Sequence, residues 1–161
     1  MGLDVKSISK HVTYKEATHN QTATQLGIDN TPDAVTIGRM KKLAEAVFQP
    51  LREHFGVSLY VSSFYRSDAL NKAVGGSKTS QHVLGEAMDI DADIYGKVTN
   101  KQLFDYIKDN LEFDQLVWEY GDNTNPAWIH VSFTERRPNR RSIIIVYKLN
   151  DGTTRSRTYD L

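Results

Sequence analysis

A histidine and an aspartate of the kind that bind metal ions lie seven residues apart in the segment 80–89, as His82 and Asp89. Both side-chain types are ligands of zinc in proteins. Gly85 and Ala87 stand between them, and residues this small leave room for another group to approach the backbone. The combination is unusual in a purely structural segment. It predicts a metal site, provided that the chain supplies a third ligand.

The third candidate ligand is His130, which lies in a predicted strand. Ile129 and Val131 share one face of this strand because side chains alternate between its faces. They are apolar and predict the core, so His130 and Trp128 point toward a cleft or a second layer. A lone histidine in such a place is usually a hydrogen-bonded polar residue without a functional role. The presence of two further candidate ligands favours a role for His130.

The absence of cysteine restricts the ligand types, because any metal must then be held by histidine or carboxylate side chains. His82, Asp89 and His130 offer two imidazoles and one carboxylate. Three protein ligands leave a fourth position open, which is typical of catalytic rather than structural zinc. A metal ion lowers the pKa of a water molecule bound in that position to about neutral. The alternative for Asp89 is a carboxylate that ends a strand or caps a helix.

Glu119 is the predicted general base, because the turn formers 121–126 join two predicted strands. A simple hairpin places Val117 opposite His130. Glu119 then falls opposite Trp128 and becomes a diagonal neighbour of His130, about 7–8 Å away at the backbone. Both side chains can then reach one water molecule. A shift of the register by one residue would turn Glu119 away, and the alternative is an exposed strand glutamate. Weaker candidates for the base are Glu86, Asp91 and Asp122.

Arg66 is the candidate anchor for a substrate, because it lies between a predicted strand and a predicted helix. A guanidinium group there can hold a carboxylate through two parallel hydrogen bonds. Ser80 and Gln81 precede His82 and can donate or accept hydrogen bonds at the same site. The alternatives are a surface arginine and two turn formers.

The predicted elements place helices early and strands late. Thr13 and Glu16 form a capping box for a helix that ends at Gly27. The other predicted helices are 32–55 with Thr31 as N-cap and a kink or break at Pro50, 68–74 capped by Ser67, and one that follows Asn100 as N-cap and extends to 111. The predicted strands are 57–62, 88–91, 113–120, 127–133, 142–149 and 153–159. This order predicts an α+β fold with a mostly antiparallel sheet.

The composition favours one domain and excludes several classes of partner. The chain has 161 residues, and its 20 basic and 20 acidic side chains give no net charge, so no global field attracts nucleic acid. We expect the cluster Arg136, Arg137, Arg140 and Arg141 to be a solvated loop, since no aromatic stacking platform accompanies it. No apolar run is long enough to insert into a bilayer, and the N-terminus lacks the pattern of a secretory signal.

A longer pattern joins these candidates. Ser80-x-His82-x-x-Gly85-x-Ala87-x-Asp89, followed by Trp128-Ile129-His130, resembles the zinc D-alanyl-D-alanine carboxypeptidase family. This family includes L-alanyl-D-glutamate peptidases of phage endolysins and shares its fold with the hedgehog signalling domain. The segment 63–77, with Arg66, Asn71 and Gly75-Gly76-Ser77, is similar to the family's approach to the metal motif. Residues 13–32 are similar to a branch that is common in phages and prophages.

The resemblance implies a hedgehog/DD-peptidase-like fold in one domain, 1–161. Residues 10–133 form the family-like core, and 134–161 form an extension with a basic loop and a β-hairpin. The resemblance also implies that His82, Asp89 and His130 bind Zn²⁺, that Arg66 contacts the substrate carboxylate and the transition state, and that Ser80 supports the site. Many members place the catalytic glutamate three residues before the last histidine, where this chain has Ala127. Either Glu119 takes over from the neighbouring strand, or the base lies elsewhere, or activity is lost; the hairpin geometry favours Glu119.

The implied activity is hydrolysis of peptide bonds in peptidoglycan stem peptides, by a carboxypeptidase or an endolysin-type peptidase. The alternative is an inactive zinc-containing module that binds the cell wall or belongs to a phage particle, which the alanine at position 127 permits. We expect synthesis in the cytoplasm with phage- or holin-type delivery to the cell wall.

Overall fold

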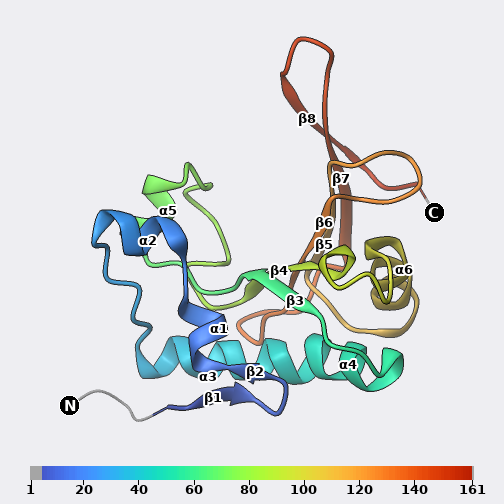
Figure 1. Cartoon of the computed structure of the whole chain (residues 1–161). Helices are drawn as coiled ribbons and strands as arrows, with labels where there is room; N and C mark the ends of the chain where they lie inside the picture. The colour runs from blue at the N-terminus through green and yellow to red at the C-terminus, as the bar shows by residue number, and fades with distance from the viewer. Residues whose placement is uncertain (1–4, 161) are drawn as a thin grey trace.

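The fold is built around a six-stranded sheet with the strand order β3-β4-β6-β5-β7-β8. It is seen in a computed structural model that describes residues 5–160 (Figure 1). The strands of this sheet are β3 (Tyr60–Ser63), β4 (Ala87–Asp91), β5 (Gln115–Glu119), β6 (Trp128–Ser132), β7 (Ser142–Lys148) and β8 (Thr154–Thr158). The α+β class predicted from the sequence is confirmed.

The sheet is mixed, because β7 runs parallel to β5 whereas the other neighbours within the described residues are antiparallel. The loop 133–141 explains this exception to the expected antiparallel order. The chain leaves β6 at the end where β5 begins, and it enters β7 at Ser142, which pairs with Gln115 at that same end. A strand that enters there must run against β6 and therefore along β5.

The helices are shorter and more numerous than the sequence predicts. They are α1 (Tyr14–Thr18), α2 (Gln21–Leu26), α3 (Ala34–Leu43), the π-helical segment η1 (Ala44–Phe48), α4 (Gln49–Phe55), α5 (Asp68–Ala73), the 3₁₀ turn η2 (Ala92–Ile94) and α6 (Asn100–Asn110). The predicted helix that ends at Gly27 is split, because the Asn20 side chain caps a second helix. A small hairpin of β1 (Ser7–Ser9) and β2 (Val12–Thr13) precedes α1 and was not predicted.

Two predicted N-caps were wrong by one or two positions. Asp33, not Thr31, caps α3 by accepting a hydrogen bond from the Thr36 N–H at 2.8 Å. Thr99, not Asn100, caps α6 through a capping box with Gln102. The Thr13 capping box and the Ser67 cap are confirmed.

Pro50 alters the long helix without ending it. The helix passes from α3 through η1 into α4, and Gly56 ends it in a left-handed conformation. The π-helical turn directly precedes Pro50, with the Gln49 N–H donating to the carbonyl of Ala44, five residues back. Because proline has no N–H to donate and clashes with the turn before it, a widened turn accommodates the ring inside a continuous helix.

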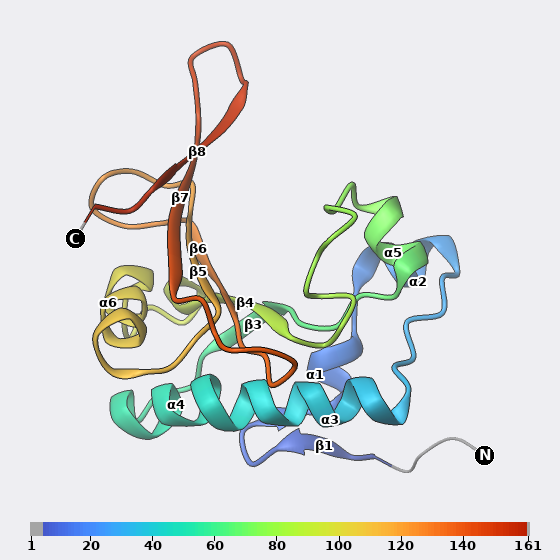
Figure 2. The same ribbon diagram turned by 180° about the vertical axis from the view of Figure 1, so that it is seen from behind.

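One face of the sheet is covered by helices and forms the core. Leu116, Trp118, Ile129 and Val131 are buried in a cluster that includes residues of α3, η1, α4 and α6. Figure 2 shows α6 on one side of β5 and β6, and α5 with α2 on the other. The β6 alternation predicted from the sequence is confirmed, because Ile129 and Val131 are buried while His130 is partly exposed. The second face is therefore the one that carries polar side chains.

The four arginines of the cluster are exposed, as expected of a solvated loop, but they are also tied to the folded structure. Asp114 is fully buried and accepts hydrogen bonds from Arg137 Nη1 at 2.7 Å and Nη2 at 3.0 Å. Arg140 donates to the same carboxylate through Nε at 3.1 Å and Nη2 at 2.9 Å. Arg136 pairs with the buried Glu86, and Arg141 lies over the ring of Phe113. Buried carboxylates thus anchor the loop 133–141 to the sheet.

Candidate metal centre

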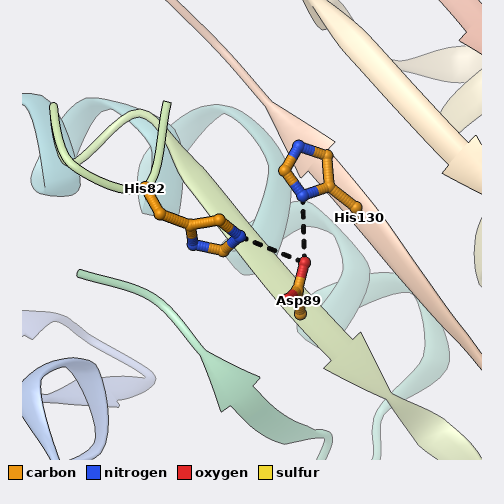
Figure 3. Close-up of side chains that lie close together, drawn as sticks. All are labelled: His82, Asp89 and His130. Carbon is orange, nitrogen blue, oxygen red and sulfur yellow. Dashed lines mark hydrogen bonds and ion pairs between the residues drawn. The ribbon is translucent and has the colours of Figure 1, made fainter. Parts of the chain in front are cut away.

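His82, Asp89 and His130 meet on the polar face of the sheet (Figure 3). The Oδ1 atom of Asp89 lies 3.3 Å from His82 Nε2 and 3.0 Å from His130 Nδ1. One ligand atom from each residue lies within 4.8 Å of the others. Three residues up to 48 positions apart in the sequence are thus brought to one point.

Two of the three side chains are positioned by strand pairing. Asp89 on β4 stands directly opposite His130 on β6 in the antiparallel ladder. Side chains of directly opposed residues project on the same face of a sheet, so the carboxylate and the imidazole are neighbours by register alone.

His82 is positioned by the turn before β4 and by a contact across the chain. Its Nδ1 atom lies 2.7 Å from the carbonyl oxygen of Phe64, just after β3. Gly85 lets this turn pack closely on α3: it has a φ of +74°, and an added Cβ would lie 2.8 Å from the Thr36 carbonyl oxygen. The small residue noted in the sequence is therefore required for packing against a helix.

The state of His82 fits a bound cation. A carbonyl oxygen only accepts hydrogen bonds, so the Nδ1 atom of His82 carries the proton and Nε2 presents a lone pair. That Nε2 atom is buried and has no hydrogen-bond partner within the described residues. It faces a carboxylate oxygen at 3.3 Å, which is unfavourable unless a positive charge lies between the two atoms. Ligand atoms bound about 2.0–2.1 Å from a tetrahedral zinc lie about 3.3 Å apart, close to the 3.3 Å and 3.0 Å that separate the two imidazole nitrogens from Asp89 Oδ1.

The electrostatics of the group favour the deprotonated ligands that a metal needs. Burial lowers the pKa of His82, although the negative charge of Asp89 opposes this. Burial by itself would raise the pKa of Asp89, but the interactions with His82 and His130 outweigh it and hold that pKa well below its usual range. A neutral imidazole therefore faces an ionised carboxylate.

Glu119 lies beside this group, in the register that the sequence predicts. Val117 pairs with His130, and Glu119 pairs with Trp128, which makes Glu119 a diagonal neighbour of His130. Burial raises the pKa of Glu119 to about 7, and the negative charge of Asp89 acts in the same direction, while His130 lowers it. A carboxyl group that titrates near neutral pH can both take up and release a proton under ordinary conditions.

Arg66 lies in the same cleft, and a hydrogen bond from one side orients its guanidinium group. Its Nη1 atom donates a hydrogen bond to the Oδ1 atom of Asn71 at 3.2 Å. Its Nε atom is buried and has no hydrogen-bond partner within residues 5–160. Gly76 is needed beside this pair, because an added Cβ would lie 2.0 Å from Asn71 Oδ1 and 2.9 Å from Arg66 Nη1. Burial lowers the pKa of Arg66, against the opposing charge of Asp89.

The loop that carries Arg66 is tied down by Asn30. The Asn30 side chain accepts a hydrogen bond from the Ser67 N–H at 2.7 Å and donates to the carbonyl oxygens of Thr18 and Tyr65. Asn30 lies within residues 13–32, the segment that is similar to the phage and prophage branch. Asn30 therefore links the end of α1 to the loop after β3, which carries Arg66.

Ser80 and Gln81 also line the cleft. Ser80 Oγ accepts a hydrogen bond from the His82 N–H at 3.3 Å, and Gln81 Nε2 lies 3.5 Å from a Glu86 oxygen. The three weaker candidates for the base are engaged elsewhere: Glu86 with Arg136, Asp91 with Asn100, and Asp122 with the turn residues that follow it.

The cleft has a volume of about 980 Å³ and also contains residues for which the sequence predicts no role there. They include Gln115, Tyr120, Trp128 and Thr154, together with Arg136, Arg137 and Arg140. Tyr120 has a φ of 56°, a conformation that is rare outside glycine. A signal for Trp128 was present in the strand alternation, which puts it on the face of His130; no local pattern indicates the others.

No helix within residues 5–160 combines the length and apolar character needed to cross a membrane. A comparison with curated protein sequences found no match. A comparison with protein families found that the chain matches the family described as peptidase M15 over residues 10–132. This match covers most of the 161 residues and contains His82, Asp89, Glu119 and His130. The chain therefore belongs to the peptidase M15 family, whose members are metallopeptidases.

Proposed function

We propose that this chain is a zinc peptidase that hydrolyses peptide bonds in peptidoglycan stem peptides, as a D-Ala-D-Ala carboxypeptidase or an endolysin-type peptidase. The observation that carries the proposal is the buried Nε2 lone pair of His82, which converges with Asp89 and His130 beside Glu119. Zinc is proposed as the metal because two imidazoles and one carboxylate suit it and leave room for a reactant. The choice of peptidoglycan rests on the resemblance of the sequence motifs.

His82, Asp89 and His130 would hold the zinc ion. When bound, zinc supplies a Lewis acid that polarises the scissile carbonyl group and increases the acidity of a water molecule. Glu119 acts as the general base: it takes the proton from the attacking water and delivers it to the nitrogen of the leaving amine. An ionised Glu119 carboxylate, which a nearby dication favours, can accept the first proton and hold it until the amine leaves.

Arg66 acts on the substrate from the other side of the cleft. Its guanidinium group binds the terminal carboxylate of the peptide or the oxygen that becomes negative during attack. The hydrogen bond to Asn71 fixes the orientation of the planar group, so less conformational entropy is lost when substrate binds. Ser80 and Gln81 offer further polar contacts to the peptide backbone.

We further propose that the protein is made in the cytoplasm and reaches the cell wall by phage- or holin-type delivery. The support is the likeness of residues 13–32 to a branch common in phages and prophages.

The decisive experiment incubates the zinc-loaded protein with defined peptidoglycan fragments and identifies the products by mass spectrometry. The proposal expects new peptide amines or released D-alanine, and the mass lost identifies the bond. Zinc content is measured on the same sample. Intact fragments with stoichiometric zinc would overturn the peptidase proposal in favour of the alternative, a metal-containing module that binds the cell wall without cutting it.

A further inference from the structure

The two ends of the cleft differ in chemistry. Glu119 and Trp128 form one opposed pair across β5 and β6, and Val117 and His130 form the next. Farther along the same two strands, the Gln115 N–H donates to Ser132 Oγ at 3.0 Å. Beyond that end lies the loop 133–141, whose arginines line the cleft. The metal-binding group is thus flanked by Trp128 and Tyr120 at one end and by arginines at the other.

The group formed by Arg137, Arg140 and Asp114 carries one positive charge in excess. Arg137 and Arg140 share the single carboxylate of Asp114. Burial would raise the pKa of Asp114, but the two arginines hold it well below its usual range, so this carboxylate stays ionised. Two guanidinium groups and one carboxylate leave a net charge of plus one. Arg136 and Glu86 form a balanced pair beside them.

Arg140 lines the cleft, and Asp114 does not occupy all of its donor atoms. Arg140 uses Nε and Nη2 on Asp114, and its Nη1 has no hydrogen-bond partner within the described residues. The Arg140 side chain is 53% exposed. It is nevertheless held in place, because its backbone N–H also donates to Asp114 at 2.9 Å. A positioned, half-exposed cation with an available N–H is suited to bind an anion.

We propose that Arg140, together with the excess charge of its cluster, forms a subsite for a side-chain carboxylate of the substrate. The subsite prefers peptides that carry an acidic residue on one side of the scissile bond. It is separate from Arg66, which lies in the loop after β3 and is proposed to take the terminal carboxylate or the oxyanion. This inference rests on the proposed peptidase function. Arg140 lies outside residues 10–132, so the family match gives no information about its role.

The small local excess of positive charge and the zero net charge of the chain favour a peptide carboxylate over the phosphates of a nucleic acid as the ligand. The excess at this end is a single charge, and the whole chain has no net charge. Polyanions are bound by extended basic surfaces that contact many phosphates. One half-exposed guanidinium inside a cleft instead matches one carboxylate.

The test measures binding rather than turnover. Peptides that differ only in one flanking side chain, glutamate or glutamine, are titrated by calorimetry into the zinc-loaded protein carrying Glu119→Gln, which prevents hydrolysis. The acidic peptide should bind about fivefold more tightly, and the difference should shrink at high salt. A second pair of peptides, ending in a free or an amidated C-terminus, reports separately on Arg66.

Arg140→Gln, added to this protein, removes the excess charge while Arg137 and the backbone N–H of residue 140 still hold Asp114. The preference for the acidic peptide should then disappear. Arg157→Gln is the matched control, because Arg157 is exposed on β8 and borders a hollow with Trp118, on the opposite face of the sheet; the preference should persist.

Equal affinity for the two flanking side chains, or a preference that survives Arg140→Gln, would overturn the subsite. Hydrolysis of peptidoglycan fragments by the wild-type protein is scored independently. Cleavage without an acidic preference refutes the subsite and keeps the peptidase, whereas an Arg140-dependent preference without cleavage supports the subsite and rejects the peptidase.

Discussion

Two groups of buried charges lie along the same cleft, and they differ in how completely they are satisfied. Asp114 receives five hydrogen bonds from Arg137 and Arg140, shared between its two oxygens. Asp89 instead faces two histidines, and the Nε2 atom of His82 has no hydrogen-bond partner among the described residues. In both groups the carboxylate pKa is lowered. The causes differ, because permanent cations act on Asp114, whereas imidazoles that can bind a metal surround Asp89.

This difference separates a carboxylate that is fully hydrogen-bonded, Asp114, from a site at Asp89 where a buried atom still has no partner. A buried carboxylate whose oxygens are fully hydrogen-bonded rigidifies the structure and needs no further ligand. A buried polar atom without a partner costs stability and needs an explanation, and at the trio that explanation is a cation. The contrast also explains why the arginines are a poor guide to function in the sequence: most of their donors are used internally.

The largest expected effect is on catalysis, from Glu119→Gln. The amide cannot accept the water proton, so hydrolysis of a peptidoglycan fragment should fall by about 10²–10⁴-fold. Zinc content should not change, since Glu119 is not one of the three ligands. Turnover is followed by chromatography of the products, and zinc by elemental analysis.

The matched control for this change is Glu45→Gln, which alters an exposed glutamate of η1 far from the cleft in the fold. It should hydrolyse at the wild-type rate. Full activity of the Glu119 variant would assign the base to another residue.

The second prediction compares the stability cost of a change at Asp114 with that of a change at His82. Asp114→Asn leaves two arginines without their anion and should lower the free energy of unfolding by about 3 kcal/mol. His82→Ala should cost only about 1 kcal/mol in the presence of a chelator, since it removes one hydrogen bond to the Phe64 carbonyl. The same change should weaken zinc binding by more than about a hundredfold.

Denaturant unfolding and competition with a zinc indicator measure these two quantities. The contrast between the clusters would be lost if Asp114→Asn reduced zinc affinity as much as His82→Ala, or if both variants were equally unstable without metal.

The site could be predicted from the sequence wherever local patterns decide the geometry. Strand alternation placed His130 on the polar face, and the turn formers 121–126 set the register that brings Glu119 beside it. The structure bears out that geometry, while the catalytic role of Glu119 remains a prediction. Period-two patterns and tight turns act over a few residues, so a single sequence contains them in full.

Contacts between distant segments could not be predicted in this way. Glu86 meets Arg136 from 50 residues away, and the carbonyl that orients His82 lies 18 residues before it. Neighbouring residues of similar type also compete for one role. Thr99 caps α6, which leaves the buried Asn100 to donate to the carbonyl of Ala127 and to accept from the Ala92 N–H. Only the tertiary structure decides between them.

The third prediction concerns pH, where the two regions act with opposite sign. The folded-state pKa of Asp114 is lowered, so its stabilising contribution is present above about pH 4 and is lost as the pH falls further. The folded-state pKa of Glu119 is raised from 4.5 to about 7. The metal-free chain therefore loses stability, by at most about 3 kcal/mol, as the pH rises between these values.

Unfolding measured in a chelator across this pH range tests the second effect. Glu119→Gln should remove the loss of stability between the two pKa values, while the acid-side loss due to Asp114 remains. Bound zinc should also remove it, because a nearby dication favours the ionised carboxylate. A wild-type stability that is flat or rising over this interval would contradict the raised pKa.

The smallest expected effect is Arg140→Gln on stability. Asp114 would keep both bonds from Arg137 and the backbone N–H of residue 140, and the lost guanidinium is half exposed. The free energy of unfolding should therefore fall by only about 1 kcal/mol, whereas Arg157→Gln should leave it nearly unchanged. A loss close to that of Asp114→Asn would mean that the folded state depends on Arg140 as much as on Asp114, which would assign Arg140 to the structural region. A small loss, together with a lost preference for the acidic peptide, would assign its role to the cleft.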